Sequence, residues 1–376
     1  MTPPLIVIAA GGTAGHVVPA LAVADALAAE RARVLFVGGR RAEATLVPAA
    51  GYELETIHVE PLHRHAPGKA ARAVLVDAGA LGSARRILRR RRPAAVMGAG
   101  GYVSGPVGMA AVLGRVPLVL AEADSHLGVT NRVLAPFADR VCLAFPIPGR
   151  SDPAPPGKPG GGRARYLVTG RPVPPPATDR AAARARFGIG AHEICVLVFG
   201  GSQGARSINH AAIVAFAGAR FRVLHAAGER DLPHLQAPDD RYDLRGYIDH
   251  FGEALIASDV VVSRAGGSIF EIAAAGRPAV LIPYPFATGD HQTSNARYME
   301  QAGAAVVIPD AELTAVRLAQ EVGGLLADRG RLRAMGRASA ALARPDAARE
   351  IARTVLAAAV RSGSPRPARS GPESGV

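Results

Sequence analysis

Tryptophan is absent from this chain, aromatic residues make up 5% of it, and only two of its 376 residues are cysteine. Cys142 and Cys195 each sit inside an apolar run, so we expect two buried core thiols. Two cysteines are too few for a disulfide framework or a zinc cluster. A chain of this length can bury a large apolar core without either, and the length predicts two or three domains.

Long apolar runs are also absent. No stretch of about 18 apolar residues occurs, so we expect no helix that spans a bilayer. The N-terminus lacks the basic segment of a secretory signal and passes directly into the apolar run 5–8. The expected protein is therefore a soluble or peripheral cytoplasmic one. The shortage of stacking aromatics and the lack of a recognised motif disfavour a nucleic-acid binder.

Lysine is scarce as well. It occurs only at Lys69 and Lys158, so arginine supplies nearly all of the formal net charge of +13. Two explanations stay open. The abundance of arginine and alanine suggests a GC-rich coding sequence, whereas a functional reading is attraction to an anionic membrane, an anionic substrate or nucleic acid.

Apolar runs rich in Val, Ile and Leu alternate with helix-like segments along most of the chain. The runs lie at 5–9, 34–37, 94–97, 118–120 and 141–145, then at 194–199, 221–225, 260–262, 279–282 and 305–308. Continuous runs of this kind are typical of parallel strands covered on both faces, so we predict an α/β fold of doubly wound sheets. Segments rich in proline and glycine at 148–162 and 172–176 separate two halves.

The two halves open alike, with a predicted strand, a glycine-rich turn and a helix. The turns are Gly-Gly-Thr-Ala-Gly at 11–15 and Gly-Gly-Ser-Gln-Gly at 200–204. Such a turn presents backbone N–H groups at a helix N-terminus, where the helix dipole favours phosphate. A third glycine-rich turn at 98–106 predicts a second phosphate site at the same sheet edge as the first.

Two common nucleotide-binding patterns do not fit these turns. The first turn is not G-x-G-x-x-G, and the second predicted strand ends at Arg40 and Arg41 without an acidic residue for an adenosine ribose, so NAD is disfavoured. NADP binding through these two arginines stays open as a minor alternative. Neither Lys69 nor Lys158 is followed by a hydroxyl residue, which excludes a P-loop nucleotidase.

A fourth motif, at 263–271, follows an apolar run and carries Glu271 about one turn into a helix. A carboxylate there can accept two hydrogen bonds from a ribose diol. The alternative is an ordinary acidic residue at a helix start, favoured by the dipole. The polar run 290–295 is likewise either part of a site or a helix start capped by Asp290.

In order and spacing, these motifs resemble glycosyltransferase family 28, in particular the enzymes that add N-acetylglucosamine (GlcNAc) to lipid I in peptidoglycan synthesis. The motifs are 11–16, 98–106, 200–205, 264–271 and 290–295, and the resemblance spans about residues 4–358. It implies a GT-B fold, in which two Rossmann-like domains face each other across a cleft. It also implies no cofactor and no metal.

The resemblance implies a domain division and a set of partners. Residues 1–170 are expected to form the acceptor and membrane-contacting domain, 171–346 the UDP-GlcNAc domain, 347–360 a helix that crosses back onto the first domain, and 361–376 a disordered tail. The implied partners are UDP-GlcNAc, lipid I, the cytoplasmic leaflet of the plasma membrane and proteins of cell-wall synthesis or division.

The resemblance also assigns residues to the two substrates. The implied UDP-GlcNAc contacts are Thr13, Ala14, Gly15, Asp124, Arg171, Ser202, Ile248, Gly267, Ser268, Glu271 and Gln292. Within this set, Ile248 matches a uracil contact and Glu271 matches a ribose contact. The implied contacts to the acceptor diphosphate are Gly12, Gly100, Gly101, Tyr102 and Ser104.

Several positions depart from the family pattern. Ala14 replaces a glycine, which is a mild change if the backbone there has a negative φ. The run 121–124 reads Ala-Glu-Ala-Asp in place of His-Glu-Gln-Asn. Pro174 replaces an arginine that contacts the nucleotide, and Arg171 is the expected substitute. The segment 264–271 is one residue shorter than usual, so the matches at 266–270 can shift by one.

The implied reaction is an inverting transfer of GlcNAc to the 4-hydroxyl of MurNAc in lipid I, which requires a base. His16 is the first candidate because its ordinary pKa lies near neutrality, and Glu122 and Asp124 are the alternatives. Three other functions stay open. They are another GT-B transferase with a diacylglycerol-type acceptor, a nucleotide-sugar 2-epimerase, and a UDP-sugar-binding subunit without activity.

The segment 72–92 interleaves apolar residues with arginines. We predict that it presents a basic amphipathic face to the membrane beside the acceptor site. The face is expected to include Leu75, Arg85, Arg86, Ile87, Leu88 and Arg89. The alternative is an ordinary arginine-rich surface helix.

Overall fold

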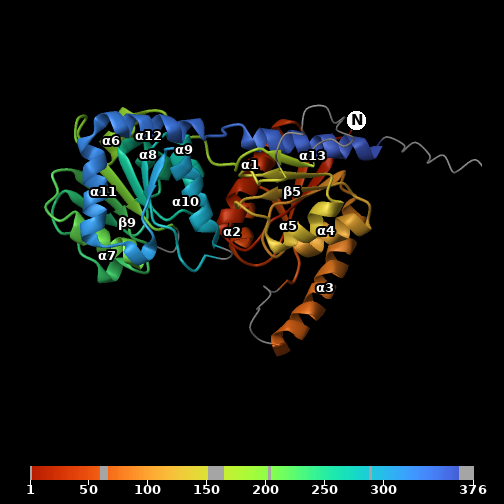
Figure 1. Cartoon of the computed structure of the whole chain (residues 1–376). Helices are drawn as coiled ribbons and strands as arrows, with labels where there is room; N and C mark the ends of the chain where they lie inside the picture. Colours follow the sequence, from red (N-terminus) through yellow and green to blue (C-terminus); the bar gives the residue numbers. More distant parts are fainter. Residues whose placement is uncertain (1, 60–66, 151–164, 202–204, 288–289, 364–376) are drawn as a thin grey trace, which may run out of the picture. The chain divides into compact units, whose positions relative to one another are not determined.

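The computed structural model describes residues 2–59, 67–150, 165–201, 205–287 and 290–363, which form two compact units (Figure 1). The N-terminal unit contains residues 1–123 and 127–172 together with the chain from Asp346 onward. The C-terminal unit contains residues 124–126 and 173–345. Within the described residues, no helix combines the length and the apolarity needed to cross a bilayer.

The N-terminal unit is built on a sheet of seven parallel strands. They are β1 (Leu5–Ala9), β2 (Arg33–Gly38), β3 (Glu53–Thr56), β4 (Ala95–Gly98), β5 (Leu118–Glu122), β6 (Arg140–Leu143) and β7 (Tyr166–Val168). Their spatial order is β3-β2-β1-β4-β5-β6-β7, so the winding direction reverses between β1 and β4. At such a reversal the helices that follow the two strands lie on opposite faces of the sheet, and ligands bind in the crevice outside the carboxyl ends of the strands.

Helices cover both faces of this sheet. The helices are α1 (Ala14–Ala29), α2 (Ala42–Ala49), α3 (Pro67–Arg91), α4 (Ser104–Leu113), α5 (Val129–Leu134) and α13 (Ala347–Gly363). Ile6 and Ile8 of β1 pack with residues of α1, α2 and α13, whereas Val7 and Ala9 pack with residues of α3, α4 and α5. Because successive strand residues point to opposite faces, each strand contributes to both apolar layers.

The C-terminal unit repeats this plan with six parallel strands. They are β8 (Cys195–Phe199), β9 (Arg222–Ala226), β10 (Tyr242–Arg245), β11 (Val260–Ser263), β12 (Ala279–Leu281) and β13 (Ala305–Val307), in the order β10-β9-β8-β11-β12-β13. The helices are α6 (Arg180–Arg186), α7 (Arg206–Ala215), α8 (Phe251–Ala257), α9 (Ile269–Ala274), α10 (His291–Gln301), α11 (Ala315–Ala327) and α12 (Arg329–Ala341). The predicted fold class, two doubly wound parallel sheets, is confirmed.

Most differences from the predicted elements lie at sheet edges and chain ends. Each predicted apolar run forms a strand, and three further strands, β3, β7 and β10, lie at edges of the two sheets. Helix α13 packs against α1, β4 and β5 and continues to Gly363, three residues beyond its predicted end. The rest of the predicted tail and most of the predicted linker 148–162 lie outside the described residues.

Cys142 and Cys195 are both buried, as expected, and burial raises the pKa of each thiol to about 12.

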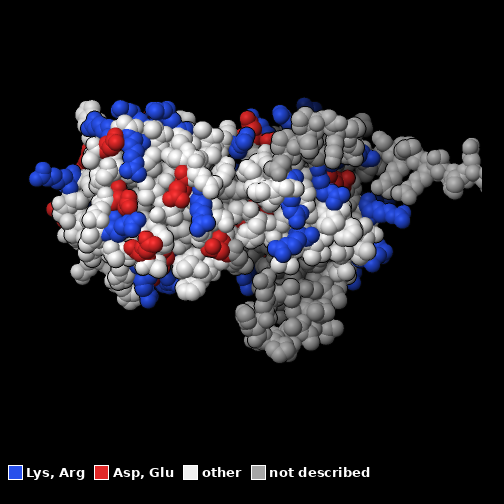
Figure 2. Space-filling view, in the orientation of Figure 1, with Lys and Arg blue, Asp and Glu red and all other residues white. Residues whose placement is uncertain are grey.

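Helix α3 corrects one prediction about the membrane face. Ile87 and Leu88 are only 7% and 6% exposed and belong to the apolar core under α3 and α4, so they are unavailable to a membrane. The reason is that this stretch of α3 packs on the sheet with its apolar stripe. Arg86 and Arg89 are exposed, Arg85 is half-buried, and the side chain of Leu75 lies outside those described. Figure 2 shows basic side chains on the face of the N-terminal unit that carries α4 and α5.

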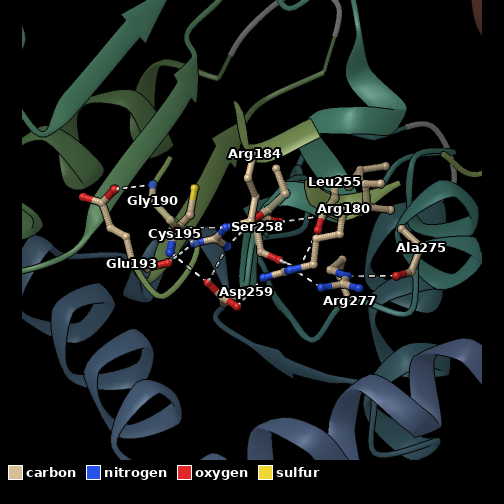
Figure 3. Close-up of polar contacts among 12 residues, drawn as sticks. Arg180, Arg184, Gly190, Glu193, Cys195, Leu255, Ser258, Asp259, Ala275 and Arg277 are labelled. Carbon is tan, nitrogen blue, oxygen red and sulfur yellow. Dashed lines mark hydrogen bonds and ion pairs between the residues drawn. The ribbon is translucent and has the colours of Figure 1, made fainter. Parts of the chain in front are cut away.

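A cluster of three arginines fixes the start of the C-terminal unit (Figure 3). Arg184 of α6 is 5% exposed and donates hydrogen bonds to the carbonyl oxygens of Ala257 (2.9 Å), Gly190 (2.7 Å) and Glu193. Arg180 and Arg277 both donate to the carbonyl of Ser258.

The acid at the centre of this cluster is Asp259. It accepts hydrogen bonds from Arg180 (2.7 Å) and from the backbone N–H of Cys195 (2.9 Å). Burial, together with the neighbouring Arg180, lowers the pKa of Arg277 to about 10. The guanidinium groups therefore satisfy the carbonyl groups at the end of α8, which the helix itself leaves without partners.

Replacing Arg184 with methionine should destabilise the C-terminal unit. The variant leaves the carbonyls of Ala257 and Gly190 without this buried donor, and we expect a loss of about 3 kcal/mol in the free energy of unfolding. Urea denaturation followed by far-ultraviolet circular dichroism measures it. Arg186→Met on the same helix is the control, because Arg186 is exposed and pairs only with Glu253 among the contacts described, which is worth less than about 1 kcal/mol. Equal losses in the two variants would contradict this account.

A second buried network holds the first turns of α7. His225 on β9 is completely buried, with Nδ1 2.7 Å from the Tyr242 hydroxyl and Nε2 3.0 Å from Asn209 Oδ1. Asn209 donates through Nδ2 to the carbonyl of Ala227 and to Asp231. Because the Asn209 oxygen faces the ring, Nε2 of His225 carries the proton and Nδ1 accepts from Tyr242. The network ties α7 to the loop after β9.

Burial lowers the pKa of His225 to about 4, from an ordinary value of 6.5, and this predicts an acid-labile unit. Between pH 6.5 and pH 4 the unfolded chain binds a proton at this position and the folded chain does not, so stability falls as the pH falls. The full difference is about 3 kcal/mol. A His225→Gln variant should have a lower free energy of unfolding at neutral pH and should lose less of it on acidification. Urea denaturation measures both. Parallel pH dependences for variant and wild type would show that His225 does not cause the acid lability.

Candidate active site

The glycine-rich turns after β1 and β4 lie next to each other at the point where the strand order of the N-terminal sheet reverses. Gly12 and Gly101 have φ values of +104° and +76°, which favour glycine. A Cβ on Gly101 would lie 2.0 Å from the carbonyl oxygen of Gly11. The two turns therefore pack backbone against backbone. Ala14 is the first residue of α1, so its helical backbone has the negative φ that its substitution requires.

His16 sits in the first turn of α1, between the two turns. Its Nδ1 lies 3.2 Å from the Thr13 hydroxyl. A Cβ on Gly100 would lie 2.7 Å from Cδ2 of the His16 ring, so the ring packs directly on the backbone of the second turn. When Nδ1–H donates to Thr13, the lone pair that a general base needs is on Nε2.

One pocket of the N-terminal unit brings His16 together with two other predicted residues, Glu122 and Arg171. Besides these three it is lined by Gly15, Pro19, Ala20, Val23, Met97, Ala99, Ala121, Ala123, Cys142, Gly170, Pro172 and Ile351. Arg171 donates to the carbonyl of Gly15 at 2.6 Å and groups with the N-terminal unit, whereas the predicted boundary made it the first residue of the C-terminal domain.

Glu122 ends β5 and is 7% exposed. Its Oε2 accepts hydrogen bonds from the backbone N–H of Gly128 (2.8 Å) and from the amide of Asn131 (2.9 Å). These bonds hold the loop after β5 to the start of α5. To act as the base, Glu122 would have to give up part of this bonding, which favours His16. Asp124 lies half-buried in the same loop.

The structure corrects part of the predicted acceptor-diphosphate set. Ser104 is fully buried, and its hydroxyl lies 3.0 Å from the carbonyl oxygen of Ala9 and 2.8 Å from that of Gly100, so it joins the two turns and does not face a ligand. The N–H of Gly12 and the hydroxyl of Tyr102 both donate to Glu43, at 2.9 and 3.1 Å. Gly100 and Gly101 are half-buried at the turn itself.

In the C-terminal unit, Glu271 lies in the first turn of α9 and lines a cavity of about 330 Å³. Asp249, His250 and Glu253 line the same cavity, together with residues 174–177 and five neighbours. The volume falls within the range of small-molecule sites, and carboxylates are suitable acceptors for the hydroxyls of a sugar. Ile248 precedes these residues and is itself buried, at 3% exposure.

The turn after β11 carries Gly267 and Ser268, both half-buried. Gln292, at the start of α10, lies beside this turn. Its Nε2 would be 3.9 Å from a Cβ on Gly266, and its Oε1 accepts from the N–H of Tyr284 at 3.0 Å. Ser202, the predicted diphosphate contact, lies outside the described residues.

No role for Arg264 was predicted from the sequence, and in the structure this residue directly follows β11. Arg264 is 8% exposed, pairs with Asp310 at 2.5 Å and donates to the Ser207 hydroxyl at 2.8 Å. It also donates to the carbonyls of Ile282 and Pro283. One guanidinium therefore ties together α7 and the loops after β11, β12 and β13. The sequence signal that could have indicated this role is a single arginine directly after a buried strand.

Among the described residues, no group of three or more His, Cys, Asp or Glu side chains is placed to hold a metal ion. The chemistry that these residues offer is acid–base chemistry at His16 and hydrogen bonding by carboxylates, amides and backbone N–H groups.

Comparison with known proteins identifies the two units. The N-terminal domain model of glycosyltransferase family 28 matches residues 6–143, and the C-terminal domain model of that family matches residues 195–351. The UDP-N-acetylglucosamine–N-acetylmuramyl-(pentapeptide) pyrophosphoryl-undecaprenol N-acetylglucosamine transferase of Moorella thermoacetica is 41% identical, over 93% of this chain and 98% of its own.

Two further comparisons agree. The enzyme of the same name from Alkalilimnicola ehrlichii is 42% identical, over 95% of this chain and 99% of its own. The crystal structure of Acinetobacter baumannii MurG aligns with a TM-score of 0.74 and 27% identity, covering 94% of this chain and 99% of that one. The resemblance inferred from the motifs is therefore confirmed, and the chain belongs to glycosyltransferase family 28.

Proposed function

We propose that this protein transfers GlcNAc from UDP-GlcNAc to the 4-hydroxyl of MurNAc in lipid I, with inversion at the anomeric carbon, and so makes lipid II. The observation that carries the proposal is the match over 93% of the chain to a relative whose name states the donor, the acceptor and the transfer of N-acetylglucosamine. The cavity beside Glu271 supports a nucleoside-sugar site, and the pocket with His16 supports a site for proton transfer.

The proposed reaction is a single displacement. The acceptor hydroxyl attacks the anomeric carbon, the bond to the diphosphate breaks, and UDP leaves. His16 takes the hydroxyl proton through Nε2. The N-terminus of α7, which follows the glycine turn after β8, stabilises the negative charge that develops on UDP, because backbone N–H groups and the helix dipole point there.

Replacing His16 with alanine should lower kcat by about 10²- to 10⁴-fold, because the acceptor hydroxyl loses its base. The assay uses UDP-GlcNAc with a soluble lipid I analogue and measures UDP release with and without the acceptor. His192→Ala is the control. His192 is exposed and precedes the start of β8, whereas the glycine turn follows the end of that strand, so the kcat of this variant should stay within about two-fold of wild type. A His16→Ala enzyme that keeps most of its kcat would remove His16 from this role.

The same assay tests the proposed function as a whole. Release of UDP and GlcNAc transfer should both require the lipid I analogue. Transfer to diacylglycerol in place of the lipid I analogue would refute the acceptor assignment. Conversion of UDP-GlcNAc to its 2-epimer without any acceptor would refute the transferase assignment.

We further propose that the N-terminal unit binds the cytoplasmic leaflet through the surface beside α3. Exposed apolar side chains at Val129, Val133 and Phe137 follow one another at intervals of four residues along α5 and the short helix after it. Arg86 and Arg89 are exposed on α3, which packs on α4, and α4 in turn packs on α5. Exposed apolar side chains and exposed arginines on the same unit suit an anionic lipid surface.

Binding to vesicles that contain anionic lipid should weaken when Arg86 and Arg89 are both changed to glutamine, and it should weaken with added salt. Co-sedimentation measures the bound fraction. Arg333→Gln with Arg337→Gln, on an exposed face of α12, removes the same charge elsewhere and should leave binding nearly unchanged. Equal losses for the two double variants would show that net charge alone, and not this surface, controls binding.

A further inference from the structure

A buried carboxylate lies directly under the glycine turns of the N-terminal unit. Glu43, in the first turn of α2, is completely buried. Its Oε2 accepts from the N–H of Gly12 at 2.9 Å. Its Oε1 accepts from the N–H of Gly39 at 2.9 Å and from the Tyr102 hydroxyl at 3.1 Å. One side chain thus joins the loops after β1, β2 and β4.

Three glycines make the space that this carboxylate fills. A Cβ on Gly11 or Gly39 would lie 2.9 Å from Glu43 Oε1, and a Cβ on Gly38 would lie 2.8 Å from Glu43 Cγ. On Gly39 it would also lie 2.4 Å from the Tyr102 hydroxyl. A side chain at any of these positions would displace the carboxylate. The three glycines are therefore required for Glu43 to pack where it does.

Glu43 is held in its charged form. Burial alone would raise the pKa of its carboxyl group. The backbone N–H groups of Glu43 itself, Gly12 and Gly39, and the Tyr102 hydroxyl, outweigh burial and hold the pKa below the ordinary value of 4.5. A buried charge with this bonding is costly to remove, because every donor that faces it would then lose its partner.

The contacts of Glu43 continue to His16. Gly12 precedes Thr13, whose hydroxyl lies 3.2 Å from His16 Nδ1, and the second turn, fixed by Tyr102, carries Gly100 against the His16 ring. Glu43 does not line the pocket that contains His16. Its effect on the reaction therefore has to pass through the two turns.

We infer that Glu43 is a positioning residue for the acceptor reaction: it fixes both glycine turns and, through them, the ring of His16. The inference rests on the proposed function. The glycine turn after β1 then has a structural role, because the N–H of Gly12 is bonded within the protein. The glycine turn after β4 and the start of α1 remain as the surface that meets the acceptor.

The test is the Glu43→Gln variant, which keeps the size of the side chain but turns one oxygen into an NH₂ group. That group must face either Gly12 N–H or the pair of Gly39 N–H and Tyr102 hydroxyl, so a donor meets a donor. We expect kcat/KM for the lipid I analogue to fall at least about ten-fold. The KM for UDP-GlcNAc should stay within about two-fold of wild type.

Asp139→Asn is the matched control. Asp139 accepts from the N–H of Leu118 at 3.0 Å, at the other end of the strands of the same sheet, so the variant disturbs a comparable bond far from the turns. It should lower the melting temperature without changing acceptor kinetics. If Glu43→Gln does not fold, Gly39→Ala decides the question, because it displaces the same carboxylate, together with the Tyr102 hydroxyl that donates to it, without removing the charge.

The outcomes separate the inference from the function on which it rests. A lower kcat/KM for the lipid I analogue with an unchanged KM for UDP-GlcNAc in Glu43→Gln or Gly39→Ala, with Asp139→Asn near wild type, supports the inference. Unchanged acceptor kinetics, or a KM for UDP-GlcNAc that rises as much as acceptor kcat/KM falls, overturns it while wild-type transfer stands. A wild-type protein that transfers nothing to the lipid I analogue refutes the proposed function, and the inference with it.

Discussion

The reversal of strand order in each parallel sheet is the constraint on which the rest of the structure depends. In the N-terminal sheet it falls between β1 and β4, and in the C-terminal sheet between β8 and β11. All strands in a parallel sheet end at one edge, so the loops after these four strands lie side by side in pairs. Each glycine-rich or polar motif of the sequence follows one of these four strands, except the run that begins α10. Because each of these motifs directly follows a strand, it lies at the edge of the sheet where that strand ends.

Buried polar groups then set the shape of each edge. Arg264 binds four loops or helix starts in the C-terminal unit, and Glu43 binds three loops in the N-terminal unit. Each is a charge removed from water and bonded to several partners, which makes any other arrangement of these loops costly. The loops are short and irregular, so apolar packing alone would not define them. These two side chains therefore define how the loops at each edge are held.

The sequence predicted the central strands and the main motifs because both depend on local composition. Strands at sheet centres are buried on both faces, so they read as apolar runs. The edge strands β3 and β10 read Glu-Leu-Glu-Thr and Tyr-Asp-Leu-Arg, so neither carried that signal. The short apolar strand β7 follows closely on the proline- and glycine-rich segment 148–162, which was interpreted as a linker. Glu43 and His225 acquire their roles from residues distant in the chain. Ile87 and Leu88 were assigned to a membrane because the apolar stripe of a helix looks the same in sequence whether a lipid surface or the protein core covers it.

The two glycine turns of the N-terminal unit look alike in sequence but differ in what they can bind. In the first, the Gly12 N–H bonds to a carboxylate that is already charged, and an anion approaching the same N–H would meet that charge. In the second, Arg41 stacks on the Tyr102 ring at 5.6 Å and places a positive charge beside the turn. This electrostatic difference supports the second turn, over the first, as the proposed site of the acceptor diphosphate. A glycine-rich turn is therefore a phosphate site only when its N–H groups are not already bonded within the protein, and that depends on a residue elsewhere in the chain.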